Sequence, residues 1–237
     1  MSPACRYRTL RSCVRGVLPL LAVFLSGAGA FAQEMKPALS PTSVRQGGLV
    51  RVTCPVADES AVSAASVAFG SVTARCFPRE GALVGLFAVA ARTRPGGHTA
   101  KLYVRYADGR FECYRLPLTV TAGTFPTQRI RMPAGKTGLM SPAILEKERE
   151  ILYGAMEEPS PEPLWEGVFA NPLAGRISSP FGRKRYVNGK YWGQHSGRDV
   201  ASPAGKPVGA TNSGRVLVAR KLWMRGNTVM IDHGMGV

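Results

Sequence analysis

Histidine is the scarcest of the chemically active side chains in this 237-residue chain. Only three are present, His98, His195 and His233. A metal site built on several imidazoles would therefore have to draw on these positions. Cysteine offers no substitute, because the five cysteines include no closely spaced pair of the kind that forms a zinc knuckle.

Acidic residues are missing from the first 33 positions, where four arginines precede an apolar run at 17–25. Ala30-Phe31-Ala32 then has the small-x-small pattern of a signal peptidase site. We predict a secretory signal peptide over 1–32, and so an exported protein of the periplasm, the cell envelope or the extracellular space. The apolar run is shorter than the roughly 20 residues that span a bilayer. No other segment is long enough, so no membrane span is expected after signal removal.

Acids are also scarce from 176 to 225, where Asp199 stands alone among eleven lysines and arginines. The whole chain carries a formal net charge of +16. A cationic surface attracts polyanions, which for an exported protein would be cell-envelope polymers or anionic lipids rather than nucleic acid. Charge alone identifies no partner, and a role in solubility is an equal alternative.

Removal of the signal peptide would leave an odd number of cysteines, Cys54, Cys76 and Cys113. At most one disulfide can then form within the chain. Cys54 and Cys113 lie in strand-like stretches at opposite ends of one predicted domain, where they could bridge two sheets. The sequence does not decide the pairing, so it stays open.

Residues 33–126 have the pattern of short β-strands separated by glycine turns. Alternating or apolar β-prone runs lie at 49–54, 82–89, 100–106 and 116–121. The Asp108-Gly109 pair indicates a hairpin. We predict a small all-β sandwich, immunoglobulin-like in class. His98 follows a Gly-Gly turn and is predicted to be a solvated loop residue.

Residues 127–164 predict a connector made of a helix and a proline-rich stretch. Ser141 can cap the helix, and Pro142 is tolerated in its first turn. The apolar residues that share one helical face are Ile144, Leu145, Ile151, Leu152 and Met156. The charged run 146–150 would form the opposite, polar face. About two heptads are too few for a coiled coil, so we expect the helix to pack on its own domains. Three prolines in 157–163 mark a domain boundary.

The segment 165–237 carries a His-x-Gly-x-Asp motif at His195, Gly197 and Asp199. In an extended strand these residues point to one face, so the imidazole and the carboxylate would emerge side by side. The glycine has no side chain to fill the space between them. An imidazole nitrogen and a carboxylate oxygen are two of the three protein ligands of a catalytic zinc. The motif alone is weak, and a surface histidine with a turn aspartate is the alternative.

The motifs around it follow one another in a fixed order. They are Phe181-Gly182-Arg183-Lys184-Arg185, Asn188-Gly189, the His195 to Asp199 motif, an Ala-x-Pro-x-Gly-x-Pro-Val run from Ala201, Ser213-Gly214-x-Val, and Gly226-Asn227-x-Val-x-Ile-Asp-His-Gly-x-Gly. In this order the segment resembles the lysostaphin-like (LytM-type) zinc metalloendopeptidases over about residues 165–237. The preceding sandwich and connector resemble the N-terminal module of some secreted members.

The resemblance implies a mainly β chain, with the sandwich and a short connecting helix followed by an antiparallel, groove-shaped peptidase domain. It implies one zinc ion, with His195 and Asp199 as its first two ligands, and hydrolysis of peptide bonds in peptidoglycan stems or cross-bridges. The family's third ligand and its assisting histidines lie in His-x-His and Tyr-x-His-Leu motifs that are absent from these 237 residues, so the catalytic residues are unknown. His233 matches the family's Asp-His-Gly turn, where the histidine is not a ligand, and a structural role is predicted for it.

The chain ends directly after that turn, before the closing strands of such a fold. We expect either a fragment that lacks the C-terminal part of the site or a degenerate member, inactive in both cases. Two functions of different class remain. One is an exported zinc endopeptidase of cell-wall remodelling, and the other is a non-catalytic module that binds peptidoglycan or regulates an amidase. Intact His195 and Asp199 favour descent from an enzyme.

Overall fold

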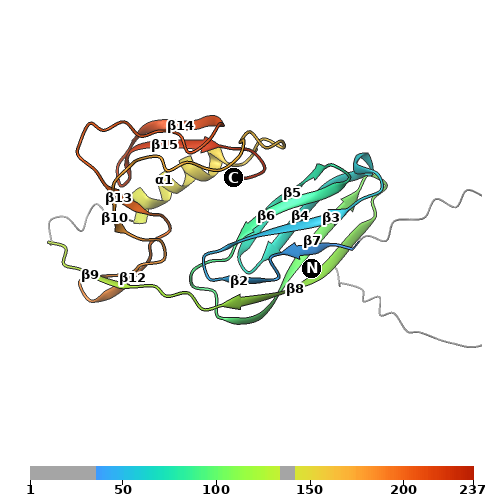
Figure 1. The fold of residues 1–237 in the computed structure, drawn as a ribbon, viewed down its shortest axis with the longest axis horizontal. Coiled ribbons are helices and arrows are strands. Elements are labelled where there is room, and N and C mark those ends of the chain that lie inside the picture. Colours follow the sequence, from blue (N-terminus) through green and yellow to red (C-terminus); the bar gives the residue numbers. More distant parts are fainter. Residues whose placement is uncertain (1–35, 134–141) are drawn as a thin grey trace, which may run out of the picture.

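The computed structural model describes residues 36–133 and 142–237 (Figure 1). The predicted signal peptide lies outside the described residues. Within them the chain forms fifteen strands, one short 3-10 turn and a single α-helix, so the mainly β class is confirmed. No helix in the described ranges is long and apolar enough to cross a membrane.

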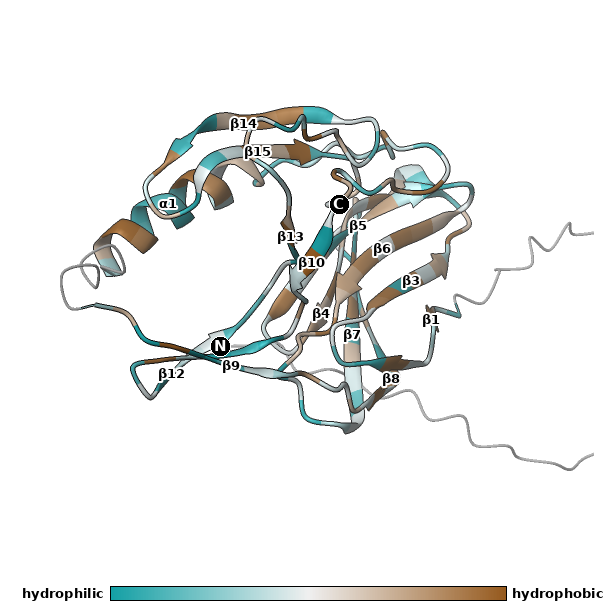
Figure 2. Cartoon of the chain, turned by 60° about the vertical axis from the view of Figure 1, so that its left-hand side comes forward, coloured by the Kyte–Doolittle hydropathy of each residue, from teal (hydrophilic) through white to brown (hydrophobic). Residues whose placement is uncertain are grey.

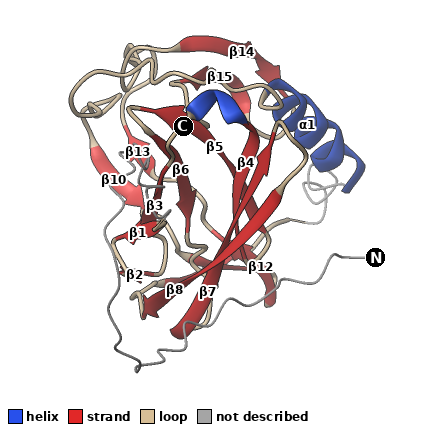
Figure 3. Ribbon diagram, turned by 90° about the vertical axis from the view of Figure 1, so that its right-hand side faces the viewer, coloured by secondary structure: helices blue, strands red, loops and turns tan. Residues whose placement is uncertain are grey.

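The N-terminal part is one eight-stranded sheet. Its strands are β1 (Ala38–Ser40), β2 (Ser43–Arg45), β3 (Leu49–Pro55), β4 (Val62–Phe69), β5 (Val72–Arg79), β6 (Ala82–Ala88), β7 (Gly96–Tyr106) and β8 (Phe111–Thr121). They are ordered β1-β3-β6-β5-β4-β7-β8-β2. Because β1 and β2 are consecutive in the chain yet pair with opposite ends of this order, one short segment bridges both ends and the sheet is nearly closed (Figure 3).

Alternating burial shows how the sequence builds this sheet. Every second residue of β3 and β8 faces inward, as the two-residue repeat of a strand requires. The inward side chains form a single core that includes Val50, Val52, Leu83, Phe87, Leu102, Val104 and Leu118. An immunoglobulin-like sandwich would divide its strands between two sheets. Here hydrogen bonding runs through all eight strands, so that finer class stays a prediction.

Two local expectations change in this sheet. His98 lies within β7 rather than in a loop, half-buried, with Nε2 at 2.7 Å from the carbonyl of Arg94 and its ring against Phe69. Within the described ranges, Cys54 and Cys76 are free thiols, so neither forms the disulfide that the sequence left open. Cys54 and Cys76 lie on β3 and β5 with β6 between them, opposite Leu83 and Gly85 of that strand. Two strand spacings, about 9.6 Å in all, and an offset of two residues along the strand separate their Cα atoms, which is beyond disulfide reach. Burial raises the pKa of Cys54 to about 11 and that of Cys76 to about 12.

The rest of the described chain consists of the helix, two pairs of strands and one three-stranded sheet. These elements are β9 (Thr127–Ile130), α1 (Pro142–Ala155), β10 (Arg176–Ser179), β11 (Lys184–Val187), β12 (Lys190–Gln194), β13 (Asp199–Ala201), β14 (Arg215–Leu222) and β15 (Gly226–Asp232). β10 pairs with β13, β14 pairs with β15, and β11 lies between β9 and β12. The predicted helix is confirmed and runs beneath β14 and β15 (Figure 2).

The expectation of a polar helix face at 146–150 is wrong at Glu148. This side chain is 2% exposed, because the turn between β14 and β15 folds over it. The Met224 amide and the Arg225 guanidinium each donate a hydrogen bond to its carboxylate at 2.5 Å. Desolvation opposes ionisation, but these hydrogen bonds outweigh it and hold the pKa of Glu148 below its usual value. Met156, assigned to the apolar face, is exposed instead.

The predicted connector contains a strand. β9 runs parallel to β11, and its flanks are fixed by the Lys184 amide donating to the Pro126 carbonyl at 2.9 Å and the Asn188 amide donating to the Ile130 carbonyl at 2.9 Å. The two parts of the chain also touch where Met235 and Trp165 pack on Phe77 of the first sheet. The limits 33–126, 127–164 and 165–237 stay predictions, but the residues after 126 already border the strands that carry the predicted site.

Candidate metal centre

Three short strands and one turn place the predicted ligands. β10 and β13 are antiparallel with Ser179 opposite Asp199, and His195 directly follows the end of β12. The backbone of His195 is held on both sides: the Gly182 amide donates to its carbonyl at 2.7 Å, and its own amide donates to the Arg183 carbonyl at 2.9 Å. The Phe-Gly-Arg motif therefore serves as the hydrogen-bonded support of the histidine.

Gly182 can make this contact because it is glycine. Its φ is +76°, a conformation that residues with a Cβ rarely adopt, and a Cβ there would overlap the ring of Phe125. Phe125 lies in turn edge-on to Phe181. The glycine thus lets the support of the histidine pack closely against residues that precede the connector.

The two predicted ligands meet. His195 Nε2 and Asp199 Oδ1 are 3.1 Å apart. Two donors bound to one tetrahedral zinc at the usual bond lengths lie about 3.3 Å apart, so the pair fits one ion with little rearrangement. A Cβ on Gly197 would lie 3.9 Å from Nε2, so the glycine leaves the imidazole edge open, as expected.

The way in which they meet differs from the expectation. Residues 195–198 form a bend between β12 and β13 rather than one extended strand. A straight strand would separate the Cα atoms of His195 and Asp199 by about 13 Å. The bend is needed because β12 pairs with β11 while β13 pairs with β10. It is this change of strand partner that brings the imidazole and the carboxylate together.

The imidazole is oriented for metal binding. Its Nδ1 lies 3.2 Å from the Pro180 carbonyl oxygen and 3.2 Å from Ser179 Oγ. A carbonyl only accepts, so this contact places the ring proton on Nδ1 and leaves the lone pair of Nε2 facing Asp199. The His195 side chain is 12% exposed and the Asp199 side chain 50%, so the pair can be reached from solvent on the carboxylate side.

Arg185 and Ser179 complete the surroundings of the pair, and the sequence assigned neither a role. Arg185 Nη2 donates to Asp199 Oδ2 at 3.0 Å and to Ser179 Oγ at 3.2 Å. Arg185 belongs to a motif that carried the family resemblance, but one sequence gives no signal that it contacts Asp199. Ser179 is 4% exposed. A polar residue just before the Pro-Phe-Gly turn was the available hint.

His233 occupies the structural position predicted for it. It is 8% exposed, with Nδ1 at 2.7 Å from the Ser213 carbonyl and Nε2 at 3.2 Å from Thr211 Oγ1. Both ring nitrogens are thus engaged by protein oxygens. Nowhere in residues 36–133 and 142–237 do three histidine, cysteine, aspartate or glutamate side chains gather at one point. The described chain brings together two donors, and its catalytic residues stay unassigned.

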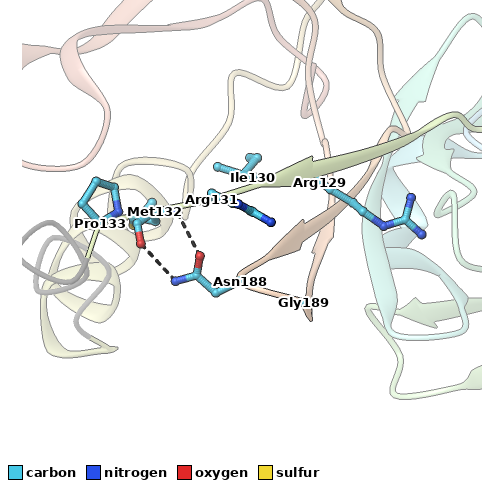
Figure 4. A pocket seen from close by; sticks show the side chains of 7 residues that line it. All are labelled: Arg129, Ile130, Arg131, Met132, Pro133, Asn188 and Gly189. Carbon is cyan, nitrogen blue, oxygen red and sulfur yellow. Dashed lines mark hydrogen bonds between the residues drawn. The ribbon is translucent and has the colours of Figure 1, made fainter.

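A separate groove of about 650 Å³ lies at the end of β9 (Figure 4). It is lined by Arg129, Ile130, Arg131, Met132, Pro133, Asn188 and Gly189. The Asn188 side chain closes one side, since its Oδ1 accepts from the Met132 amide at 2.9 Å and its Nδ2 donates to the Met132 carbonyl at 3.1 Å. The groove contains none of the predicted ligands.

Comparison with known proteins places the candidate pair within a family segment. Residues 193–237 match the model of Peptidase family M23. Curated relatives include the DD-carboxypeptidase/endopeptidase Mpg of Neisseria meningitidis serogroup B and that of Neisseria gonorrhoeae, each 42% identical over 62 residues. The matched stretch covers 26% of this chain and only 14% of the length of those relatives. The segment that matches Peptidase family M23 includes His195 and Asp199, and the resemblance predicted from the motifs is confirmed over these residues.

Proposed function

We propose that this chain functions in an exported zinc endopeptidase that hydrolyses peptide bonds of peptidoglycan stems or cross-bridges during cell-wall remodelling. One observation carries the proposal: His195 Nε2 and Asp199 Oδ1 lie 3.1 Å apart inside the segment that matches Peptidase family M23. The names of the relatives, which include an endopeptidase, support the reaction class. The signal-peptide pattern at 1–32 supports export to the periplasm, the envelope or the medium.

The residues of the candidate metal centre define what the chain contributes to such a reaction. His195, held as the Nδ1–H tautomer, and Asp199 would be two of the zinc ligands. Zinc supplies Lewis acidity toward a carbonyl oxygen and lowers the pKa of water. The anionic ligand would partly neutralise the ion, and Gly197, whose Cβ would lie 3.9 Å from Nε2, leaves the imidazole edge open.

Metal binding by the purified mature chain tests this proposal. A zinc titration is expected to show one weak site per chain, because two protein donors are fewer than the three that catalytic zinc sites use. For the same reason the 237-residue polypeptide alone is expected not to hydrolyse peptidoglycan. Absence of saturable zinc binding would overturn the metal assignment. Hydrolysis by the chain alone would overturn the expected inactivity and require a further donor at the site.

The second candidate is a non-catalytic module of the same fold that binds peptidoglycan or regulates an amidase. The observation in its favour is that the described residues supply no third metal donor beside the pair. Sedimentation with purified peptidoglycan distinguishes the two functions. A module should bind equally well with and without a zinc chelator, whereas a peptidase site that uses zinc to hold its substrate should bind less well once the metal is removed.

We also propose that the groove at the end of β9 binds anionic cell-envelope polymers. Arg129 lies on β9 and Arg131 directly follows its end. Among the ion pairs of the described residues, none includes either arginine. The lining of the groove contains no acidic residue. Two unneutralised guanidinium groups beside one hollow form a local positive field, which attracts repeated anionic groups.

A charge-matched pair of double variants tests this partner, with sodium polyphosphate as the probe. Arg129→Gln/Arg131→Gln removes two charges from the groove, and Arg220→Gln/Lys221→Gln removes two from the exposed part of β14. Loss of two phosphate contacts should lower the slope of log K against log salt by about 1.4. We expect that change only in the groove variant. Equal losses in both variants would show that overall charge, rather than the groove, holds the polymer.

A further inference from the structure

We propose, on the basis of the zinc site proposed above, that Arg185 and Ser179 are positioning residues that fix both ligands before the metal binds. Four side chains form a closed ring of contacts. Arg185 Nη2 contacts Asp199 Oδ2 and Ser179 Oγ, Ser179 Oγ contacts His195 Nδ1, and His195 Nε2 contacts Asp199 Oδ1. Each ligand is therefore held from the side opposite to the one it would present to zinc.

The guanidinium decides which carboxylate oxygen is available. Asp199 is half exposed, so without a partner its side chain would rotate freely in water and lose conformational entropy on binding a metal. Arg185 occupies Oδ2 at 3.0 Å and leaves Oδ1 beside His195 Nε2. Asp199 is thereby set to bind through one oxygen. Both contacts are made by one nitrogen, Nη2, at the end of a rigid planar group. A lysine would have to hold a flexible ammonium at the same point and would lose more conformational entropy in doing so.

Ser179 links the arginine to the histidine. Its strand position opposite Asp199 fixes its backbone, and burial at 4% exposure restricts its hydroxyl. The Oγ accepts from Arg185 at 3.2 Å and lies 3.2 Å from His195 Nδ1. The imidazole is then confined between this hydroxyl and the Pro180 carbonyl.

The conformation of the Arg185 side chain leaves one buried donor without a hydrogen bond, which lowers the stability of the fold. Its Nε is buried and has no hydrogen-bond partner among the described residues. A buried unsatisfied donor costs about 1–3 kcal/mol, and native proteins keep few of them. Meanwhile β11, which carries Arg185, is held between β9 and β12. The strand therefore keeps the guanidinium in a pose that satisfies Asp199 and Ser179 rather than its own Nε.

Zinc affinity measured by competition with a chromophoric chelator tests the proposal in three variants, Arg185→Gln, Arg185→Lys and Ser179→Ala. Loss of an outer partner of a metal ligand typically weakens metal binding by about 10–100-fold. We expect that loss in Arg185→Gln, little recovery in Arg185→Lys, and a smaller loss in Ser179→Ala. Arg198→Gln is the matched control, because it removes an exposed positive charge next to Asp199 without breaking the ring of contacts.

The direction of the change in zinc affinity distinguishes a positioning role of Arg185 from simple repulsion between its charge and the zinc ion. If Arg185 acted only as a positive charge near the ion, its removal would strengthen zinc binding, as in Arg198→Gln. Unchanged or tighter binding in Arg185→Gln, with a wild-type circular dichroism spectrum, would overturn the proposal. Should Arg185→Gln fail to fold, Ser179→Ala at wild-type affinity would overturn it equally. Failure of the proposed function looks different, since the wild-type chain itself would then bind no zinc.

Discussion

Replacement of His195 by alanine is expected to abolish saturable zinc binding. The imidazole is the oriented, half-buried donor of the pair, with its proton placed on Nδ1 by the Pro180 carbonyl. What remains is Asp199, a half-exposed carboxylate already bonded to Arg185. A single carboxylate of this kind has no dedicated geometry for zinc. Isothermal titration with zinc, together with the absorption spectrum of bound Co²⁺, would measure the loss.

His98→Ala provides the matched control for this prediction. It also removes one imidazole, but from β7 of the first sheet, where Nε2 contacts the Arg94 carbonyl. We expect zinc binding to be unchanged in this variant. Wild-type affinity in His195→Ala would place the metal elsewhere in the chain, and His233 would be the next histidine to replace.

Gly234→Ala is expected to destabilise the fold by about 2–5 kcal/mol. Gly234 has φ +91°, and a Cβ there would meet the backbone carbonyl of Glu162, with the Leu164 amide nitrogen 3.0 Å away. Neither group can move easily, because the Leu164 amide donates to the His233 carbonyl at 2.7 Å. Asp232 adds a further constraint, since its carboxylate accepts from the Gly234 amide at 2.8 Å.

Gly236→Ala separates backbone strain from overlap. Gly236 has a similar φ of +78°, but nothing lies within 4 Å of a Cβ placed on it. We therefore expect only the strain, about 1–2 kcal/mol. Urea denaturation followed by tryptophan fluorescence would report both variants, because Trp165 packs against Met235 and Phe77. Equal losses would show that the Glu162 contact contributes nothing.

The sequence correctly predicted the features that depend on residues close together in the chain. Strand periodicity located the segments that form the core of the first sheet, and the Ser141-Pro142 pair located the start of the helix. The spacing of His195 and Asp199 correctly predicted that these two side chains lie together. The prediction relied on a straight strand, whereas a bend brings them into contact. Each of these signals lies within a few residues of the feature that it predicts.

The features that the sequence predicted wrongly or did not predict depend on contacts between distant segments. Glu148 was placed on a polar face because its neighbours are charged, yet its carboxylate is bound by residues of the hairpin turn 76 and 77 positions later. The edges of the first sheet close through β1 and β2, which are only three residues each. The contacts of Arg185 and Ser179 arise only once β10, β11 and β13 are assembled. The periodicity of a single sequence does not indicate which distant segments pair with one another.

The parallel pairing of β9 with β11 has a consequence for how such proteins can be recombined. The match to the model of Peptidase family M23 begins at residue 193, inside β12, whereas the hydrogen-bonded unit around Arg185 begins at Thr127. A chimera joined at the start of the family match would inherit His195, Asp199 and β13, but not β9, β10 and β11, which carry Ser179 and Arg185. The module that can be exchanged as one piece is therefore longer than the segment matched by the family model, and it begins in the segment that the sequence predicts to be a connector.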